Sequence, residues 1–107
     1  MVLYKVIKYE ALIQTGALNE AALLLAEIAP IADIHNVWFY LALAQVLLDQ
    51  NELALQSLRR VYSAQPSFRV SYERDRMNFY DAHDGGEYFI RGWALLEPLE
   101  KSILKMN

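Results

Sequence analysis

The sequence contains no cysteine, so it can form no disulfide and offers no thiolate as a metal ligand or nucleophile. It also lacks an apolar run of the roughly 18 residues that a transmembrane helix needs. Glu27, Asp33 and Asp49 interrupt its richest apolar region. We therefore expect no membrane span.

Basic residues are missing from much of the chain. No lysine or arginine lies between Tyr9 and Leu58, where six acidic residues are found, and the net charge is −3. A nucleic-acid-binding surface is normally basic overall, so we expect no nucleic-acid partner. Lys5 and Lys8 are followed by Glu10 rather than by an apolar segment. We therefore expect no signal peptide and a cytoplasmic location.

Motifs that carry chemistry are also scarce. His35 and His83 are far apart, and neither has a second ligand at helical spacing, which argues against a zinc helix. Asp81, His83 and Asp84 could bind a metal, but a polar helix end before a turn explains them as well. We expect no metal and no cofactor.

Catalytic motifs are incomplete. Ser102 and Lys105 have the spacing of a serine-lysine nucleophile motif, but its companion elements are absent. Gly85-Gly86 follows no predicted strand, so a phosphate-binding loop is not indicated. We expect the protein not to be an enzyme.

Apolar residues are abundant, at 55% of the chain. The segment from Asn36 to Asp49 is the most apolar, and Gln45 is the one plainly polar residue between its ends. A helix that is apolar on every side is typical of one enclosed by other helices. We expect this central helix to organise the fold.

Turn signals divide the rest of the chain into further helices. Residues 68–72 alternate like a strand, but the residues that follow favour a helix over 69–82. We interpret Pro30, Pro66 and Pro98 as helix ends, since proline lacks the amide N–H that a helix interior requires. We predict helices over about 2–15, 19–29 and 36–49, and a fourth helix that carries 53–62. A fifth helix covers 69–82, and a sixth follows Asp84-Gly85-Gly86 and runs to Pro98. A short segment follows over 99–106.

This punctuation repeats. The prolines are separated by 36 and 32 residues, and the turn residues Gly16, Asn51 and Gly85 by 35 and 34. A helix-turn-helix unit of about 34 residues is the period of the tetratricopeptide repeat. The expected pairs cover about 2–30, 36–66 and 69–98, with a C-terminal segment at 99–107.

The middle unit resembles a tetratricopeptide repeat in detail. Trp38, Leu41 and Ala42 match the large and small residues of its first helix, and Ala54, Leu58 and Pro66 match positions of the second. The first unit matches through Asn19–Leu23, which echoes Asn51–Leu55. In the third unit, Tyr88 occupies a position where the family has a small residue. The resemblance implies an all-α fold of three antiparallel helix pairs stacked as a short solenoid. Helical hairpins of another kind remain an alternative.

A tetratricopeptide-like arrangement implies a concave groove, which here would be mostly apolar. We expect Gln45 to face the partner helices, and an amphipathic client helix to lie in the groove. The alternative is that the groove residues are core, covered by the tail after Pro98 or by a second copy. The predicted groove residues are Tyr4, Ile7, Ala11, Asn36, Phe39, Leu43, Val46, Val70, Met77 and Tyr80.

Two functional classes follow from this groove. The first is a chaperone or adaptor that shields a helical segment of a client protein. The stretches Ala11–Gly16 and Leu25–Ile28 resemble the start of the co-chaperones of the type III secretion needle subunit. The second class is a structural or assembly subunit, including a homo-oligomer, that associates through the same surface.

Overall fold

The computed structural model describes residues 11–76 and 86–105, and these residues form helices joined by short turns. Residues 11–14 are helical, and five longer helices follow. The described residues contain no strand, so the all-α prediction is confirmed. The strand alternative for 68–72 is wrong, because 70–72 are helical. The helices are α2 (Leu18–Ala32), α3 (His35–Leu47), α4 (Asn51–Ala64), α5 (Val70–Arg76) and α6 (Glu87–Lys105).

Three successive helices end at a residue in the left-handed conformation. Gly16 has φ 85°, and Asp33 and Asp49 have φ 48° and 63°. At Gly16 the amide of Ala17 bonds back to the carbonyl of Leu12, and at Asp49 the amide of Gln50 bonds to the carbonyl of Gln45. These bonds satisfy carbonyls that a helix end leaves without partners. The turn predicted at Gly16 is confirmed. Asn51, the second predicted turn residue, is instead the first residue of α4, and the turn lies just before it. Gly85, the third, lies outside the described residues.

Two of the three predicted proline stops are wrong. Pro30 lies inside α2, which continues to Ala32 and ends at Asp33. Pro98 lies inside α6, which continues to Lys105, so 99–105 is not a separate segment. Proline removes one hydrogen bond from a helix, but packing on both sides of it can maintain the helix. Only Pro66 follows a helix end, and the proline spacing therefore does not mark a structural period.

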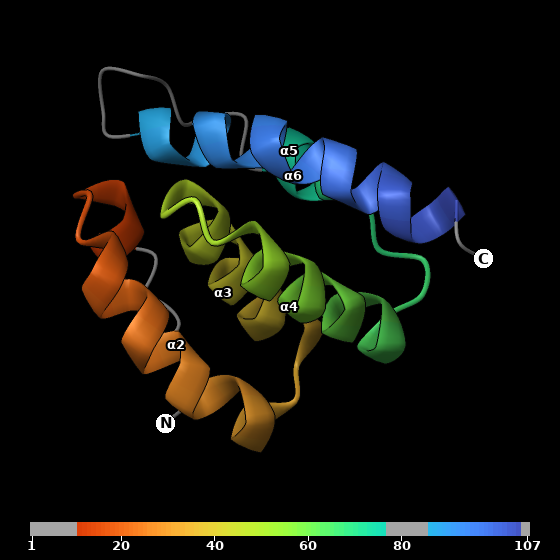
Figure 1. Ribbon diagram of the computed structural model, residues 1–107, viewed down its shortest axis with the longest axis horizontal. Helices are drawn as coiled ribbons and strands as arrows, with labels where there is room; N and C mark the ends of the chain where they lie inside the picture. Colours follow the sequence, from red (N-terminus) through yellow and green to blue (C-terminus); the bar gives the residue numbers. More distant parts are fainter. Residues whose placement is uncertain (1–10, 77–85, 106–107) are drawn as a thin grey trace.

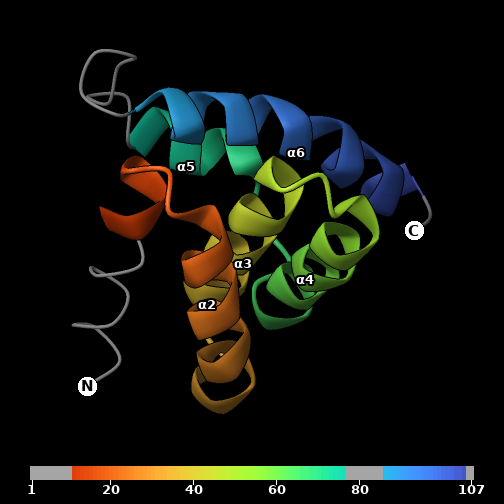
Figure 2. The same cartoon turned by 60° about the vertical axis from the view of Figure 1, so that its left-hand side comes forward.

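The central helix is enclosed as predicted. Figure 2 shows α3 between α2 and α4, and α3 packs against α2, α4 and α6. Its residues from Phe39 to Val46 are all buried. Figures 1 and 2 show α5 and α6 lying together on one side of the other three helices.

The residues after Pro98 make hydrogen bonds to α4 and α5. The Glu100 carboxylate accepts a hydrogen bond from the Tyr62 hydroxyl of α4, and its Oε2 also accepts one from the backbone amide of Val70, at 2.8 Å. Val70 is the first residue of α5, and the backbone amide of a first helical residue has no hydrogen-bond partner within its helix. Ile103 is buried as well. These contacts explain why α6 continues past its proline.

None of the helices in the described ranges is both long and apolar enough to cross a membrane.

Candidate partner-binding groove

The side of α3 predicted to face a client is covered within the chain. Phe39 and Leu43 are fully buried, as is Val70 of α5, and Val46 is buried almost as completely. Their predicted exposure in the free chain is wrong. The physical reason is α6, whose own apolar side needs cover and finds it on this side of α3.

Gly92 allows α6 to approach α3 closely. A Cβ atom added to this glycine would lie 2.3 Å from Cδ1 of Leu43 and 3.5 Å from Cδ1 of Leu47. Carbon atoms do not approach to 2.3 Å, so any larger residue would force Leu43 to move. The approach brings Phe89 and Trp93 into the core beside Gly92.

Phe68 closes the N-terminal part of the same side. Its ring centroid lies 5.2 Å from that of Phe39, 5.6 Å from that of His35 and 6.3 Å from that of Tyr62. These separations are typical of favourable aromatic pairs. Two parts of the chain thus occupy the predicted groove. One is the turn that precedes α5, and the other is α6.

The other predicted groove residues have different surroundings. Asn36 is half-buried at the start of α3, and Ala11 is exposed. Tyr4, Ile7, Met77 and Tyr80 lie outside the described residues, as do Asp81, His83 and Asp84 of the candidate metal site. No three potential metal ligands come together among the described residues.

An opening remains on the other side of α3. It has a volume of about 270 Å³ and lies between α2 and α4, with α3 as its floor. We call it the α2–α4 groove. Most of its lining is apolar or uncharged, and Arg60 is the charged residue among the described residues that line it. The lining residues are Ala26, Trp38, Leu41, Gln45, Leu53, Gln56, Ser57 and Arg60.

Trp38 is held in place at one end of this groove. Its indole N–H donates a hydrogen bond to Asp33 Oδ1 at 3.3 Å, and the guanidinium of Arg60 lies 5.6 Å from its ring centroid. A cation at that distance is attracted by the face of an indole ring. Trp38 is half-buried, so part of its ring is accessible from the groove.

The floor of the groove contains a buried polar pair. The hydroxyl of Ser57 donates a 2.6 Å hydrogen bond to Oε1 of Gln45. The prediction that Gln45 faces a partner helix is confirmed, since Ser57 belongs to α4. This pair explains how the one polar residue of the central helix is accommodated in the core.

Leu53 is the exposed large apolar residue of the lining. Its side chain is 46% exposed, and Gln56 and Arg60 extend the same wall along α4. We did not predict this wall, because the fourth helix was predicted without dividing its residues between a buried and an exposed side. A leucine at helical spacing from Gln56 and Arg60 belongs to the polar side of α4, and that was the signal available in the sequence.

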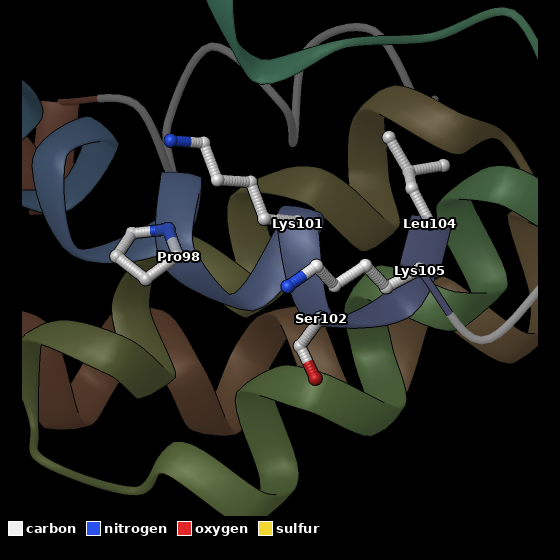
Figure 3. Close-up of a pocket in the computed structure, with 5 residues that line it drawn as sticks. All are labelled: Pro98, Lys101, Ser102, Leu104 and Lys105. Carbon is white, nitrogen blue, oxygen red and sulfur yellow. The ribbon is translucent and has the colours of Figure 1, made fainter.

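A further hollow lies elsewhere, on the last turns of α6. It measures about 630 Å³, and its described lining comes from one helix: Pro98, Lys101, Ser102, Leu104 and Lys105. Figure 3 shows these side chains spreading outward from that helix. Ser102 and Lys105 are both exposed, whereas a lysine that activates a serine is normally desolvated. This hollow is an open surface rather than a built site.

Comparisons of the chain with protein-family models, with curated proteins and with solved structures gave no match.

Proposed function

We propose that this protein is a binding module that receives an apolar helix of a partner protein at the α2–α4 groove. The observation that carries the proposal is the opening between α2 and α4, with an exposed leucine on its wall and an accessible tryptophan on its floor. Aromatic residues and arginine are enriched where proteins bind one another. Trp38 and Arg60 bring both kinds of residue to one end of the groove.

The size of the groove limits how the partner binds. A helix has a diameter of about 10 to 12 Å with its side chains, so it cannot enter a hollow of about 270 Å³. The partner helix therefore lies along the walls and inserts one or two apolar side chains between Leu53 and Ala26. Arg60 at the end of the groove favours an acidic residue on the partner.

Narrower statements about the module are part of the same proposal. The buried Ala54 and Leu58 in the α3–α4 pair support a tetratricopeptide-like hairpin. The likeness of Ala11–Gly16 to needle-subunit co-chaperones supports a chaperone of type III secretion, and a cytoplasmic location accompanies that role. The uncharged floor of the groove favours binding over catalysis.

The proposal is tested by crosslinking from single positions in the native host. A photoreactive residue is placed at Leu53, and a second variant carries it at Leu95 of α6. The two leucines are matched in exposure, at 46% and 44%. We expect a discrete crosslinked partner from position 53 and none from position 95. A partner band from position 53 that Ala26→Glu, on the α2 wall of the groove, removes and that Leu95→Glu keeps would support the groove.

Equal crosslinking from both positions, or a band from position 53 that survives Ala26→Glu, would contradict the proposal. Both substitutions lie at exposed positions, so neither should unfold the chain. Melting curves of the two variants should therefore match that of the parent protein.

A second candidate function is self-association as an assembly subunit. Leu23 and Ile31 are 72% and 84% exposed, and they lie two turns apart on the outer surface of α2. Exposed apolar residues grouped in this way mark association surfaces. Sedimentation of the purified protein tests this candidate. We expect an oligomer that Leu23→Glu dissociates and that Leu53→Glu leaves intact.

A further inference from the structure

A second pocket lies at the N-terminal end of α3, away from the α2–α4 groove. It measures about 410 Å³, and its walls come from the start of α3, the turn before α5, and α5 itself. Asn36 lines this pocket and Trp38 lines the groove. Two positions along a helix correspond to about 200° of rotation, so the two openings face different directions.

Asn36, which lines the pocket, carries a hydrogen-bond acceptor that no described residue satisfies. Oδ1 of Asn36 is buried and has no hydrogen-bond partner. A buried polar atom without a partner costs about 1 to 3 kcal/mol, and a bound group that donates a hydrogen bond would remove that cost. The unpaired oxygen therefore favours a ligand with an N–H or O–H group.

The pocket also contains a buried carboxylate. Glu73 is 6% exposed and lines the pocket. It has an interaction within the chain, but an ionised carboxylate has about four acceptor positions and can take further donors. An acidic group beside an unpaired acceptor favours a positively charged donor over a neutral one.

Aromatic side chains complete the wall. The ring of Phe68 packs against that of His35, and Tyr72, which is 60% exposed, stands at the entrance. The faces of phenylalanine and tyrosine rings attract ammonium and guanidinium groups. The aromatic rings and the carboxylate that line this pocket therefore both attract a cation.

The N-terminal end of α3 would by itself favour an anion. Glu73, however, already supplies a carboxylate in the pocket that the first residues of α3 line. One donor that an anion could use is also engaged, because Nε2 of Gln65 donates to Oγ of Ser67 at 3.1 Å. The acceptor of Asn36 and the further acceptor positions of the Glu73 carboxylate therefore favour a donor, and a positively charged one over a neutral one.

We propose that this pocket binds the charged end of a basic side chain, the ammonium of lysine or the guanidinium of arginine, carried by a partner chain. Asn36 Oδ1 and the Glu73 carboxylate accept its hydrogen bonds, and the rings of Phe68 and Tyr72 surround its charge. The site uses none of the residues of the α2–α4 groove, so either proposal can fail without the other.

The test is a titration of the full chain followed by amide NMR. The probes are Nα-acetyl-lysine amide and Nα-acetyl-arginine amide, and their neutral counterparts are the norleucine and citrulline amides. We expect saturable shifts at the amides of His35, Asn36 and Tyr72 with at least one cationic probe and not with its neutral counterpart. The stronger of the two cationic probes identifies the source of the charge.

Substitutions in the pocket sharpen the result. Glu73→Gln should weaken binding of the cationic probe by roughly tenfold or more, because it removes a charge-assisted hydrogen bond. Glu52→Gln is the matched control, since Glu52 is exposed at the opposite end of α4 from Gln65, and it should leave binding unchanged. Asn36→Asp should tighten binding. Tyr72→Ala alters an exposed side chain and should weaken binding several-fold without unfolding the chain.

Several outcomes would overturn the inference. Equal shifts with the cationic and neutral probes would make the pocket an apolar site, and saturable shifts with acetate would make it an anion site. The absence of saturable shifts with both cationic probes would mean that no such site exists. If Glu73→Gln unfolds the protein, unchanged binding in both Tyr72→Ala and Asn36→Asp would still reject the proposal.

Discussion

The two sides of α3 are both apolar, but they have different neighbours. The side of Phe39 and Leu43 is sealed by α6 and Phe68, whereas the side of Trp38 keeps an opening between α2 and α4. The roles are the reverse of those the sequence suggested. A helix that is apolar all round shows that every side is in contact, but its composition does not say which contact lies within the chain.

The largest effect should come from Phe39→Ala. Phe39 is fully buried against Phe68, so its truncation should cost about 3 to 5 kcal/mol of unfolding free energy. Trp38→Ala, on the open side, should cost less than about 3 kcal/mol, because part of the ring is already exposed. Chemical denaturation of both variants measures the difference. If Phe39→Ala proves the milder change, the assignment of the sealed side is wrong.

Glu100→Ala should have the next largest effect. Its carboxylate joins α4, α5 and α6 through Tyr62 and the amide of Val70. Hydrogen bonds to a charged group contribute about 1.5 to 3 kcal/mol, so we expect a loss of about 2 to 3 kcal/mol of unfolding free energy. Glu27→Ala, an exposed glutamate on α2, is the matched control and should change stability by less than about 0.5 kcal/mol. Equal melting of the two variants would show that the Glu100 contacts do not hold α6.

The same contact predicts a response to alkaline pH. Burial, and then the hydrogen bond to Glu100, raise the pKa of the Tyr62 hydroxyl above its ordinary value. A tyrosine in the unfolded chain loses its proton near pH 10, so above that pH the unfolded state binds fewer protons than the folded state. The stabilisation is fully present below about pH 10 and is lost as the pH rises further.

Denaturation of the parent and of Tyr62→Phe measures this response. The difference in unfolding free energy between the two should be constant up to about pH 10 and should shrink above it. A difference that stays constant to higher pH would show that the environment of Tyr62 does not favour its protonated form.

A smaller effect should follow from Gly92→Ala, which tests how closely α6 seals α3. Alanine adds about 1 kcal/mol of helix propensity, but overpacking a core costs about 1 to 3 kcal/mol. We expect a net loss of about 1 kcal/mol, because the new Cβ would meet the buried Leu43. In a Leu43→Ala background the loss should become a gain. A double-mutant cycle measured by denaturation gives this coupling directly.

Leu53→Glu should affect stability least, by less than about 0.5 kcal/mol. The side chain is half exposed on the open side, so its replacement leaves no cavity. Leu95→Glu on α6 should behave in the same way. A clear loss of stability for Leu53→Glu alone would show that the α2–α4 groove is a closed part of the core.

Much of the fold could be predicted because its signals are local. The all-helical character, the enclosed central helix and the turn at Gly16 each depend on a few neighbouring residues. The ends of α2 and α6 could not be predicted from proline alone. At Pro98 the deciding contacts come from Tyr62 and Val70, which are 38 and 30 residues from Glu100 in the chain.

The candidate site was harder to predict for the same reason. The prediction that Gln45 faces a partner helix was correct. Its hydrogen bond to Ser57 is buried because it lies between the two helices. The identity of the open side depended on where α6 docks, and no local pattern specifies that. Gly92 was the available hint, because a glycine within an amphipathic helix often marks a close approach of another element.

The docking of α6 has a consequence for the newly made chain. The helices α2, α3 and α4 are consecutive and form local contacts, which are made quickly. The segment that covers Leu43 is synthesised last among the described helices, and at about 5 to 20 residues per second the wait from residue 64 to residue 105 is several seconds. Throughout that interval the ribosome carries a partly folded protein with its most apolar helix uncovered on one side.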